Sequence, residues 1–362
     1  MKIVTVVGAR PNFVKVAPIL TELAEYPFIS TILVHTGQHY DTQMSGAFFA
    51  NLDIPRPDTN LEVQSASAVS QIADIMARLE PVLQAARPDV VVVVGDVNST
   101  VAAALTAVKV GRPVAHVEAG LRSFDRSMPE EVNRVLTDAV SDVLFTTEPS
   151  ANDNLAREGI AADRIHFVGN VMIDTLFRYR EKARESDVLD RLNLVHGGYA
   201  TLTLHRPSNV DDEGTLGMLL EAIARIQAEI PVVFPVHPRT RRRLAALACV
   251  LPPMPGLRVI DPLPYLDFLQ LMAESRCVLT DSGGIQEETT ALGIPCMTLR
   301  HNTERPVTVA RGTNRVVGTD PDAIYASWRA VAEGGWPTGE LPELWDGKAA
   351  GRIVRGLLGM GR

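Results

Sequence analysis

The feature that most limits how this chain can fold is an alternation of short, uninterrupted apolar runs with segments of helical apolar spacing. The clearest run is the stretch of valines at residues 90–94. Similar runs occur at residues 3–7, 32–35, 114–117, 143–145 and 165–168. Strands without polar alternation are buried on both faces, as in a parallel sheet that helices cover on both sides. The pattern therefore predicts an α/β fold built on parallel sheets.

The alternation restarts in the second half of the chain, with runs at residues 200–204, 231–236, 257–260, 277–280 and 296–299. A chain of 362 residues is also longer than one hydrophobic core usually supports. We expect the break between Gly169 and Gly198. The sequence predicts two Rossmann-like, doubly wound domains, residues 1–169 and 170–345, and a helix in residues 346–362 that packs back on the first domain.

Composition and charge exclude several kinds of protein. Hydrophobic residues make up 46% of the chain and charged residues 22%, which excludes a disordered polymer. The formal charge of −8 leaves no overall basic field, so we expect neither nucleic acid nor an anionic membrane as a partner. The three cysteines lack disulfide or zinc spacing, and no signal-peptide core or membrane span is recognisable. These features predict a cytoplasmic protein.

Polar residues gather immediately after the strand runs. In open parallel sheets, ligands bind beyond the carboxyl ends of the strands. The segments found there are Gly8-Ala9-Arg10-Pro11, Gly95-Asp96, Glu118-Ala119-Gly120, His205-Arg206, His237-Pro238-Arg239 and Asp281-Ser282-Gly283-Gly284. Their polar and titratable groups predict a site with nucleotide-like contacts in a cleft between the two domains.

Two of these segments are suited to anions. Arg10 and Lys15, beside a glycine turn and a helix start, predict a small anion site, with a tight turn and surface cations as the alternative. Ser282, Gly283 and Gly284 can offer backbone N–H groups to a diphosphate, and Glu288 can accept hydrogen bonds from ribose hydroxyls. The alternative for the second segment is a helix cap made by Asp281 or Ser282.

Carboxylates and histidines at the strand ends are candidates for proton transfer. Asp96, Glu118 and Glu130 can divide acid and base work if they converge, although each can instead be a turn or cap residue. Glu131 can equally be a solvated acid in the first turn of a helix. His205 and His237 can act as general acid or base, or donate to a phosphate, with a structural histidine as the alternative.

Metal and cofactor motifs are missing from the sequence. It contains no GxGxxG, no GxxxxGK[ST], no HExxH and no cysteine cluster. Asp320-Pro321-Asp322 superficially resembles a metal-binding DxD motif, but its place before a helical stretch favours a cap. We therefore expect neither a metal nor a redox cofactor.

Taken in order, the motifs resemble those of a known family, the non-hydrolysing UDP-N-acetylglucosamine 2-epimerases. The match covers nearly the whole chain and runs through G-A-R-P, T-G-Q-H-Y-D, G-D-V-N-S-T, H-V-E-A-G-L-R-S, P-E-E-V-N-R, T-L-H-R, P-V-H-P, D-S-G-G-I-Q-E-E and T-E-R-P.

The resemblance implies a fold of the glycosyltransferase-B type with its active site in the interdomain cleft. It also implies reversible conversion of UDP-N-acetylglucosamine to UDP-N-acetylmannosamine, by anti elimination of UDP to a 2-acetamidoglucal and re-addition of UDP. Such enzymes act in nucleotide-sugar metabolism for polysaccharide biosynthesis, need no cofactor and commonly form homodimers.

The resemblance also assigns residues. It implies catalytic roles for Asp96, Glu118, Glu130 and His205. It implies substrate or UDP binding by Arg10, Lys15, Arg134, His237, Ser282, Gly283, Gly284, Glu288 and Arg305. Which carboxylate removes the C2 proton and which returns it stays open.

The chain departs from the family pattern at a few positions, which keeps other functions open. Asn12 and Ser208 stand where many members have acidic residues, so the sugar can differ: a 2,3-diacetamido uronic acid or UDP-glucose is an alternative. Tyr40 replaces an arginine of regulated members, which predicts weak or absent activation by a second UDP-N-acetylglucosamine. A hydrolysing epimerase, a glycosyltransferase on the same scaffold and a nucleotide-sugar sensor are further alternatives.

Overall fold

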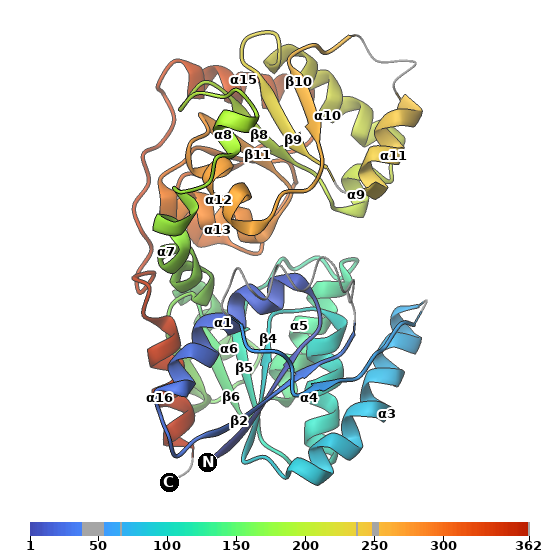
Figure 1. The fold of residues 1–362 in the computed structure, drawn as a ribbon, viewed down its shortest axis with the longest axis vertical. Coiled ribbons are helices and arrows are strands. Elements are labelled where there is room, and N and C mark those ends of the chain that lie inside the picture. The colour runs from blue at the N-terminus through green and yellow to red at the C-terminus, as the bar shows by residue number, and fades with distance from the viewer. Residues whose placement is uncertain (38–53, 66, 237, 248–252, 361–362) are drawn as a thin grey trace. The chain divides into compact units, whose positions relative to one another are not determined.

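The computed structural model describes residues 1–37, 54–65, 67–236, 238–247 and 253–360. It divides into two compact units, Met1–Arg178 with Glu343–Arg362, and Tyr179–Pro342. Figure 1 shows that each unit is a parallel sheet covered by helices. The predicted α/β class with two Rossmann-like sheets is confirmed.

The first unit has a seven-stranded parallel sheet in the order β3-β2-β1-β4-β5-β6-β7. Its strands are β1 (Lys2–Val7), β2 (Ser30–His35), β3 (Thr59–Asn60), β4 (Val90–Val94), β5 (Val114–Ala119), β6 (Val143–Thr146) and β7 (Ile165–Phe167). Its helices are α1 (Arg10–Ala24), α3 (Ala68–Ala86), α4 (Asn98–Lys109), α5 (Pro129–Val140), α6 (Pro149–Arg157) and α16 (Ala349–Gly359), with a 3-10 turn at Ala162–Arg164. Helix α7 (Val171–Ala183) begins in this unit and ends in the second.

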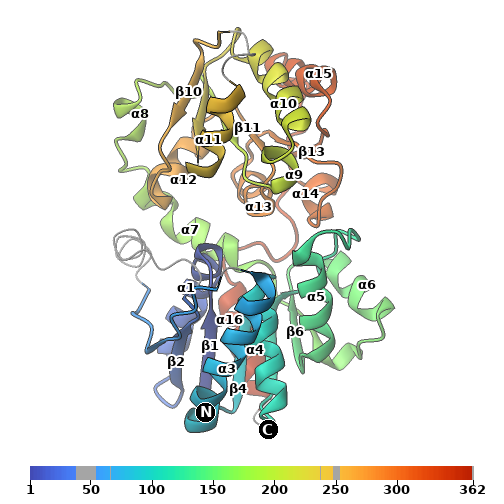
Figure 2. The same ribbon diagram turned by 90° about the vertical axis from the view of Figure 1, so that its right-hand side faces the viewer.

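The core of this unit follows from the apolar runs. Every valine of β4 is buried, because helices cover the sheet on both faces. Helix α3 contributes Ile75, Leu79 and Leu83, which are spaced four residues apart and so share one face of the helix. Helices α3, α4 and α5 cover one side of the sheet, and α1 and α16 lie side by side on the other (Figure 2).

The second unit has a six-stranded parallel sheet in the order β10-β9-β8-β11-β12-β13. Its strands are β8 (Ala200–Thr203), β9 (Val232–Pro235), β10 (Leu257–Ile260), β11 (Cys277–Thr280), β12 (Cys296–Thr298) and β13 (Asn314–Val316). Its helices are α8 (Val188–Arg191), α9 (Pro207–Val210), α10 (Glu213–Ile226), α11 (Pro238–Leu247), α12 (Tyr265–Ala273), α13 (Gly283–Leu292), α14 (Pro306–Ala310) and α15 (Pro321–Ala332).

The C-terminal segment belongs to the first unit. Asp174 in α7 accepts the backbone N–H groups of Ala349 and Ala350, the first two residues of α16. Trp345 just before this helix is buried, and its indole N–H donates to the carbonyl of Thr147. These contacts attach the C-terminal segment to α7 and to the residue after β6 in the first unit.

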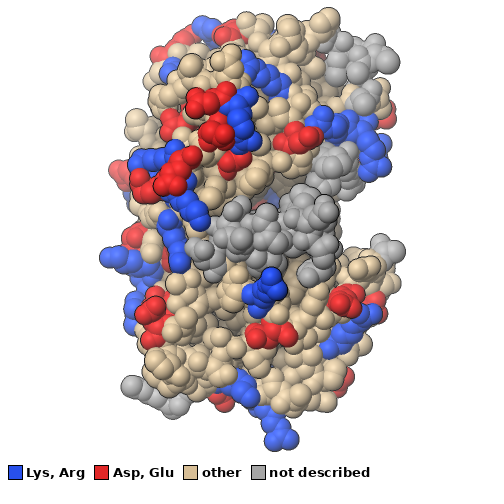
Figure 3. Space-filling view, in the orientation of Figure 1, with Lys and Arg blue, Asp and Glu red and all other residues tan. Residues whose placement is uncertain are grey.

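The surface and the helices add two findings. On the face drawn in Figure 3, acidic and basic side chains are interspersed over the described residues. Among the helices that the structure describes, none is long and apolar enough to cross a membrane.

Both sheets reverse their strand order once, and this positions the candidate site. The reversal lies between β1 and β4 in the first unit and between β8 and β11 in the second. Connections leave in opposite directions at such a point, so the chain opens a crevice at the carboxyl ends of the two strands. The candidate residues follow these strands and their neighbours.

Candidate active site

Two of the predicted groups, Lys15 and Glu118, meet in the first unit. Lys15 lies in α1, and its Nζ is 2.8 Å from Oε1 and 2.6 Å from Oε2 of Glu118. Both side chains are buried. Glu118 at the end of β5 has a φ of +71°, a left-handed conformation that costs about 1–3 kcal/mol and persists only where the surroundings enforce it. The fold therefore holds a buried, cation-paired carboxylate in an enforced position.

A second carboxylate, Asp96, follows β4 and is held by Arg134 of α5. Arg134 Nη2 is 2.5 Å from Asp96 Oδ2, and Nη1 donates to Glu131 Oε2 over 2.8 Å. Glu131 also accepts hydrogen bonds from the backbone N–H and hydroxyl of Ser123. The interpretation of Glu131 as a solvated acid is therefore wrong, because Glu131 is buried. Glu130 beside it keeps partial exposure.

The two ion pairs border the same turn. A Cβ atom on Gly95 would lie 3.1 Å from Lys15 Nζ, and Asp96 follows Gly95 directly. The first unit thus brings Lys15, Glu118, Asp96 and Arg134 to one edge of its sheet, with Glu130 at the start of α5. Carboxylates that have separate cationic partners can take different roles in proton transfer.

Asn12, one of the departures from the family pattern, is committed to the backbone. Its Oδ1 accepts the N–H of Ala9 over 3.0 Å and that of Gly8 over 3.3 Å, while its Nδ2 donates to the carbonyl of Val94 over 2.8 Å. A carboxylate could not make the last bond, because it has no hydrogen to donate. The buried Asn12 therefore shapes the first loop, whereas Ser208, the other departure, is exposed.

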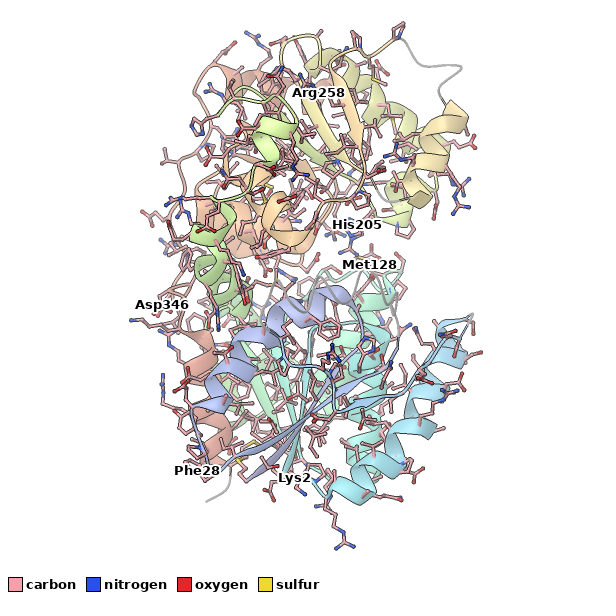
Figure 4. The ribbon with its side chains drawn as sticks, viewed as in Figure 1. Lys2, Phe28, Met128, His205, Arg258 and Asp346 are labelled. Carbon is pink, nitrogen blue, oxygen red and sulfur yellow. The ribbon has the colours of Figure 1, made fainter. Side chains whose placement is uncertain are left out.

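In the second unit, His205 is paired with Asp281 at the end of the neighbouring strand. His205 lies just beyond β8 (Figure 4). Its Nδ1 is 2.8 Å from Asp281 Oδ1, and the backbone N–H groups of His205 and Arg206 donate to the same carboxylate. Burial raises the pKa of Asp281, but the interaction with the His205 side chain, together with the backbone N–H groups of residues 205 and 206, outweighs burial and holds that pKa below its ordinary value. A carboxylate on Nδ1 orients the imidazole and leaves Nε2 as the working nitrogen.

The start of α13 is the segment that the sequence predicts to bind a diphosphate. Ser282 occupies the N-cap position, and among the described residues its side chain makes no capping hydrogen bond. Asp281 does not cap the helix either, because its carboxylate is used by residues 205, 206 and 209. The cap alternative is therefore right about the position of Ser282, which is the N-cap residue without a side-chain capping bond, and wrong for Asp281. Gly283 and Gly284 begin a helix whose N-terminal N–H groups suit a diphosphate.

An arginine cluster adjoins this helix start. Arg305 Nε donates to Glu287 Oε1 over 2.6 Å, and Arg300 and Arg206 both contact Glu304, at 2.9 and 3.4 Å. A Cβ atom on Gly283 would lie 2.6 Å from Glu304 Oε1, so the cluster touches the first residue of α13. The three guanidinium groups lie close to the N-terminus of α13, where they can add positive charge to that of the helix dipole.

Glu288 is buried one turn further along α13. Its Oε1 accepts a hydrogen bond from the hydroxyl of Tyr265 over 3.2 Å. Burial raises the pKa of Glu288 to about 7, although the Tyr265 hydrogen bond lowers it. Such a carboxylate can accept two hydroxyl groups of a ligand when it is ionised.

A cavity of about 210 Å³ lies next to His205 in the second unit. Its lining is mostly apolar and consists of Thr203, Leu204, His205, Pro235, Pro262, Leu263 and Phe268. Prolines and one aromatic ring suit a flat heterocycle. Phe268 was not singled out by the sequence, where an aromatic residue within a helix indicates only core packing.

The chain has been compared with known proteins. A family model described as UDP-N-acetylglucosamine 2-epimerase matches residues 21–358. The chain belongs to this family. It is 41% identical over 365 residues to the UDP-N-acetylglucosamine 2-epimerase of Methanocaldococcus jannaschii, with 98% of each chain covered. A crystal structure of the M. jannaschii enzyme with UDP-GlcNAc and UDP superposes with a TM-score of 0.90 at 40% identity, over 99% of both chains.

Another relative of this epimerase family acts on a different sugar by name. The UDP-2,3-diacetamido-2,3-dideoxy-D-glucuronate 2-epimerase of Pseudomonas aeruginosa is 42% identical over 332 residues, with 91% of this chain and 92% of that protein covered. Overall identity therefore does not separate the two substrates. The fold predicted from the resemblance, the glycosyltransferase-B type, is confirmed by the superposed epimerases.

Some predicted groups of this epimerase lie outside the described residues. These are His237, the region of Tyr40 and the side chain of Arg10, so the prediction of weak activation by a second substrate molecule stays a prediction. Among the residues that the structure does describe, no group of three His, Cys, Asp or Glu side chains is placed to hold a metal ion.

The pKa of Glu288 gives a prediction for ligand binding to the epimerase. Above pH 7 this carboxylate is ionised and can accept ribose hydroxyls; below pH 7 a proton must leave before it can. We expect the dissociation constant of uridine to rise as the pH falls through about 7, by up to tenfold per pH unit. Uridine is the probe because it has a ribose but no titrating phosphate.

Titration calorimetry or NMR between pH 5.5 and 8.5 measures this effect, with those limits set about one and a half units either side of the pKa. The control is Glu288→Gln, which should bind uridine more weakly and without pH dependence. A wild-type dissociation constant that is flat across this range contradicts the assigned contact.

Proposed function

We propose that this chain epimerises C2 of UDP-N-acetylglucosamine, giving UDP-N-acetylmannosamine reversibly. Membership of the epimerase family supports the reaction type. The observation that carries the proposal is the pairing of two carboxylates, Glu118 and Asp96, with separate cations at the end of one sheet. A protein that only binds a nucleotide sugar has no need for carboxylates held in this way.

The first unit is assigned to the sugar. The C2 hydrogen is not next to a carbonyl, so it becomes acidic only as the C1–O bond breaks and positive charge develops at C1. A carboxylate held by a cation can accept this proton or stabilise that charge without reorganising. Asp96 and Glu118 are suited to these tasks. Glu130 is partly exposed and can exchange protons with solvent, as a group that returns a proton must.

The second unit is assigned to UDP. The uracil ring is assigned to the cavity lined by Phe268, and the ribose hydroxyls to Glu288. The diphosphate is assigned to the start of α13 and the nearby Arg305, where backbone N–H groups and positive charge coincide. His205 Nε2, oriented through Asp281, can donate a proton or hydrogen bond to the departing phosphate.

One experiment tests the reaction directly. Proton NMR of the protein with UDP-N-acetylglucosamine in deuterated water follows C2–H exchange and the anomeric signals. We expect deuterium at C2 and the appearance of UDP-N-acetylmannosamine. Free N-acetylmannosamine with UDP would instead identify a hydrolysing enzyme, and exchange-free UDP release would indicate a glycosyltransferase.

A second substrate is supported by one observation, the 42% identity to the P. aeruginosa diacetamido-glucuronate epimerase. The same NMR assay is run with UDP-2,3-diacetamido-2,3-dideoxyglucuronate, and UDP-glucose completes the panel. A kcat/KM higher for the uronate than for UDP-N-acetylglucosamine would replace the primary proposal by this one.

We also propose that the enzyme works in the cytoplasm as a homodimer. Two of its three cysteines, Cys277 and Cys296, are free and buried, which suits a reducing compartment. The homodimer rests on the family resemblance alone. Light scattering coupled to gel filtration measures the mass, and a monomer at micromolar concentration contradicts the dimer.

A further inference from the structure

Three titratable side chains are buried together in the first unit, and none of them has a role in the proposed reaction. They are His116 in β5, Arg122 in the loop after it and Asp138 in α5. His116 and Asp138 are each 0% exposed and Arg122 is 3% exposed. Burying a charged group costs free energy unless the group is paired, so we expect a buried cluster of this kind to have a structural or functional role.

Hydrogen bonds connect His116 to a backbone carbonyl on one side and to Asp138 on the other. His116 Nε2 is 2.8 Å from the carbonyl oxygen of Gly95, and Nδ1 is 2.6 Å from Asp138 Oδ1. A carbonyl oxygen only accepts, so Nε2 carries a hydrogen. Burial raises the pKa of Asp138, but His116 and Arg122 outweigh burial and lower that pKa, so Asp138 is ionised. The short contact between Nδ1 and Oδ1 therefore joins the ring to this carboxylate.

The second oxygen of Asp138 fixes the other side of Glu118. Asp138 Oδ2 accepts the backbone N–H of Gly120 over 3.0 Å and lies 2.7 Å from Arg122 Nη2. One carboxylate thus holds His116, two residues before Glu118, and Gly120, two residues after it. These two contacts lie on either side of Glu118, whose backbone φ of +71° must be held by its surroundings.

The backbone at Gly120 is closely confined by its neighbours. Its own φ is +78°, and a Cβ atom there would lie 2.5 Å from the carbonyl oxygen of Ala151. Its carbonyl accepts a hydrogen bond from the side chain of Asn154. The segment after β5 is therefore fixed between α5 and α6, and Asp138 is one of the charged side chains that it contacts.

The other end of the network reaches Asp96. The carbonyl that His116 binds belongs to Gly95, the residue directly before Asp96, and Gly95 also has a positive φ of +71°. The carbonyl of Asp96 itself accepts a hydrogen bond from Asn133 Nδ2 of α5. Helix α5 thus holds the backbone carbonyls on both sides of the Asp96 Cα atom. Asp138 acts on the Gly95 carbonyl through His116, and Asn133 bonds directly to the Asp96 carbonyl.

We propose that Asp138 and His116 are positioning residues that set the backbone of Glu118 and of Asp96 together. The proposal rests on the proposed function, because it takes these two carboxylates to be the reacting groups. A fully paired buried network is rigid, and breaking one partner leaves an uncompensated charge that moves the rest. The network makes the spacing of two carboxylates, which come from different strands, depend on one helix.

The test begins with Asp138→Asn, which keeps the shape and removes the charge. We expect kcat to fall by about 10- to 100-fold, because a displacement of about 1 Å in a reacting group costs roughly that much. KM and the dissociation constant of UDP should stay within about twofold, since the second unit is assigned to UDP. This split between kcat and UDP binding is not expected of general destabilisation.

Two further variants make the measurement specific. His116→Gln keeps a donor for the Gly95 carbonyl but removes the ring nitrogen that contacts Asp138, and the double variant with Asp138→Asn should lose no more than the worse single variant. The matched control is Asp174→Asn, a buried carboxylate of the same unit that accepts two backbone N–H groups at the start of α16. It should keep its kcat even if its melting temperature falls.

Hydrogen exchange measures how firmly the network holds the backbone and does not depend on turnover. In folded Asp138→Asn, peptides covering residues 94–98 and 114–120 should exchange faster, whereas Asp174→Asn should leave them unchanged. Unchanged exchange in these peptides, full kcat in Asp138→Asn, or an equal loss of kcat in the control overturns the proposal. If the wild-type protein turns over no UDP-sugar, the proposed function fails, and hydrogen exchange still decides whether Asp138 fixes these segments.

Discussion

Glu118→Gln is expected to lower kcat by about 10²- to 10⁴-fold, the range for loss of a group that transfers a proton in the transition state. The amide keeps the size of the side chain but can neither accept the C2 proton nor balance positive charge at C1. The affinity for UDP should stay close to that of the wild-type protein, because UDP is assigned to the second unit. Steady-state kinetics and titration calorimetry with UDP measure the two quantities.

The buried ion pair complicates this variant and determines its controls. Glu118→Gln leaves the Lys15 ammonium, 2.6 Å from the former carboxylate oxygen, without its counter-charge. Lys15→Met combined with Glu118→Gln removes both charges. If the double variant regains stability but not turnover, the loss belongs to the carboxylate itself. Glu185→Gln, an exposed glutamate, is the matched surface control. A kcat within about tenfold of wild type in Glu118→Gln contradicts a role in proton transfer.

The sheets and the edge that carries the site could be predicted, because their signals are local. The valines of residues 90–94 indicate a doubly covered strand by themselves, and residues such as Asp96 and Glu118 are located by following a strand to its end. Strand order was not needed for this step. Any parallel strand delivers the residue after it to the same edge of the sheet.

Partners that come from distant parts of the chain could not be predicted. Asp281 reads as a helix cap in the sequence, but β8 pairs with β11, and this pairing carries its carboxylate to His205, 76 residues earlier. The same limit applies to Glu131. Its first-turn position suggests solvent, and only the fold shows that Ser123 and Arg134 bury it. At a helix start, the sequence alone does not distinguish a capping or solvated side chain from one that pairs with distant residues.

The arginine cluster shows a related limit. Arg206 and Arg300 stand at strand ends, and Glu304 belongs to the T-E-R-P motif, but neither signal shows that these side chains meet. Their contacts with Glu304 exist because the loops after β8 and β12 converge on α13. Position after a strand identifies candidates, whereas the choice among them needs the tertiary pairing.

The pairing of His205 with Asp281 gives the second large effect. His205→Asn should lower kcat by about 10²- to 10³-fold, because Nε2 is the group assigned to the departing phosphate. Asp281→Asn keeps the histidine but replaces its Nδ1 acceptor by an amide, and we expect a loss of about 10- to 100-fold from misorientation of the ring.

The double variant separates orientation from direct action. If Asp281 acts only through His205, then His205→Asn with Asp281→Asn should be no slower than His205→Asn alone, because the carboxylate then has no ring to orient. The backbone N–H groups of His205 and Arg206 also bond to Asp281, so melting temperatures are measured for all three variants. Asp212→Asn, the exposed cap of α10, is the matched control for losing a backbone-bound aspartate in this unit. Multiplicative losses in the double variant would show that Asp281 contributes to turnover independently of His205, and the oriented-imidazole mechanism would then be wrong.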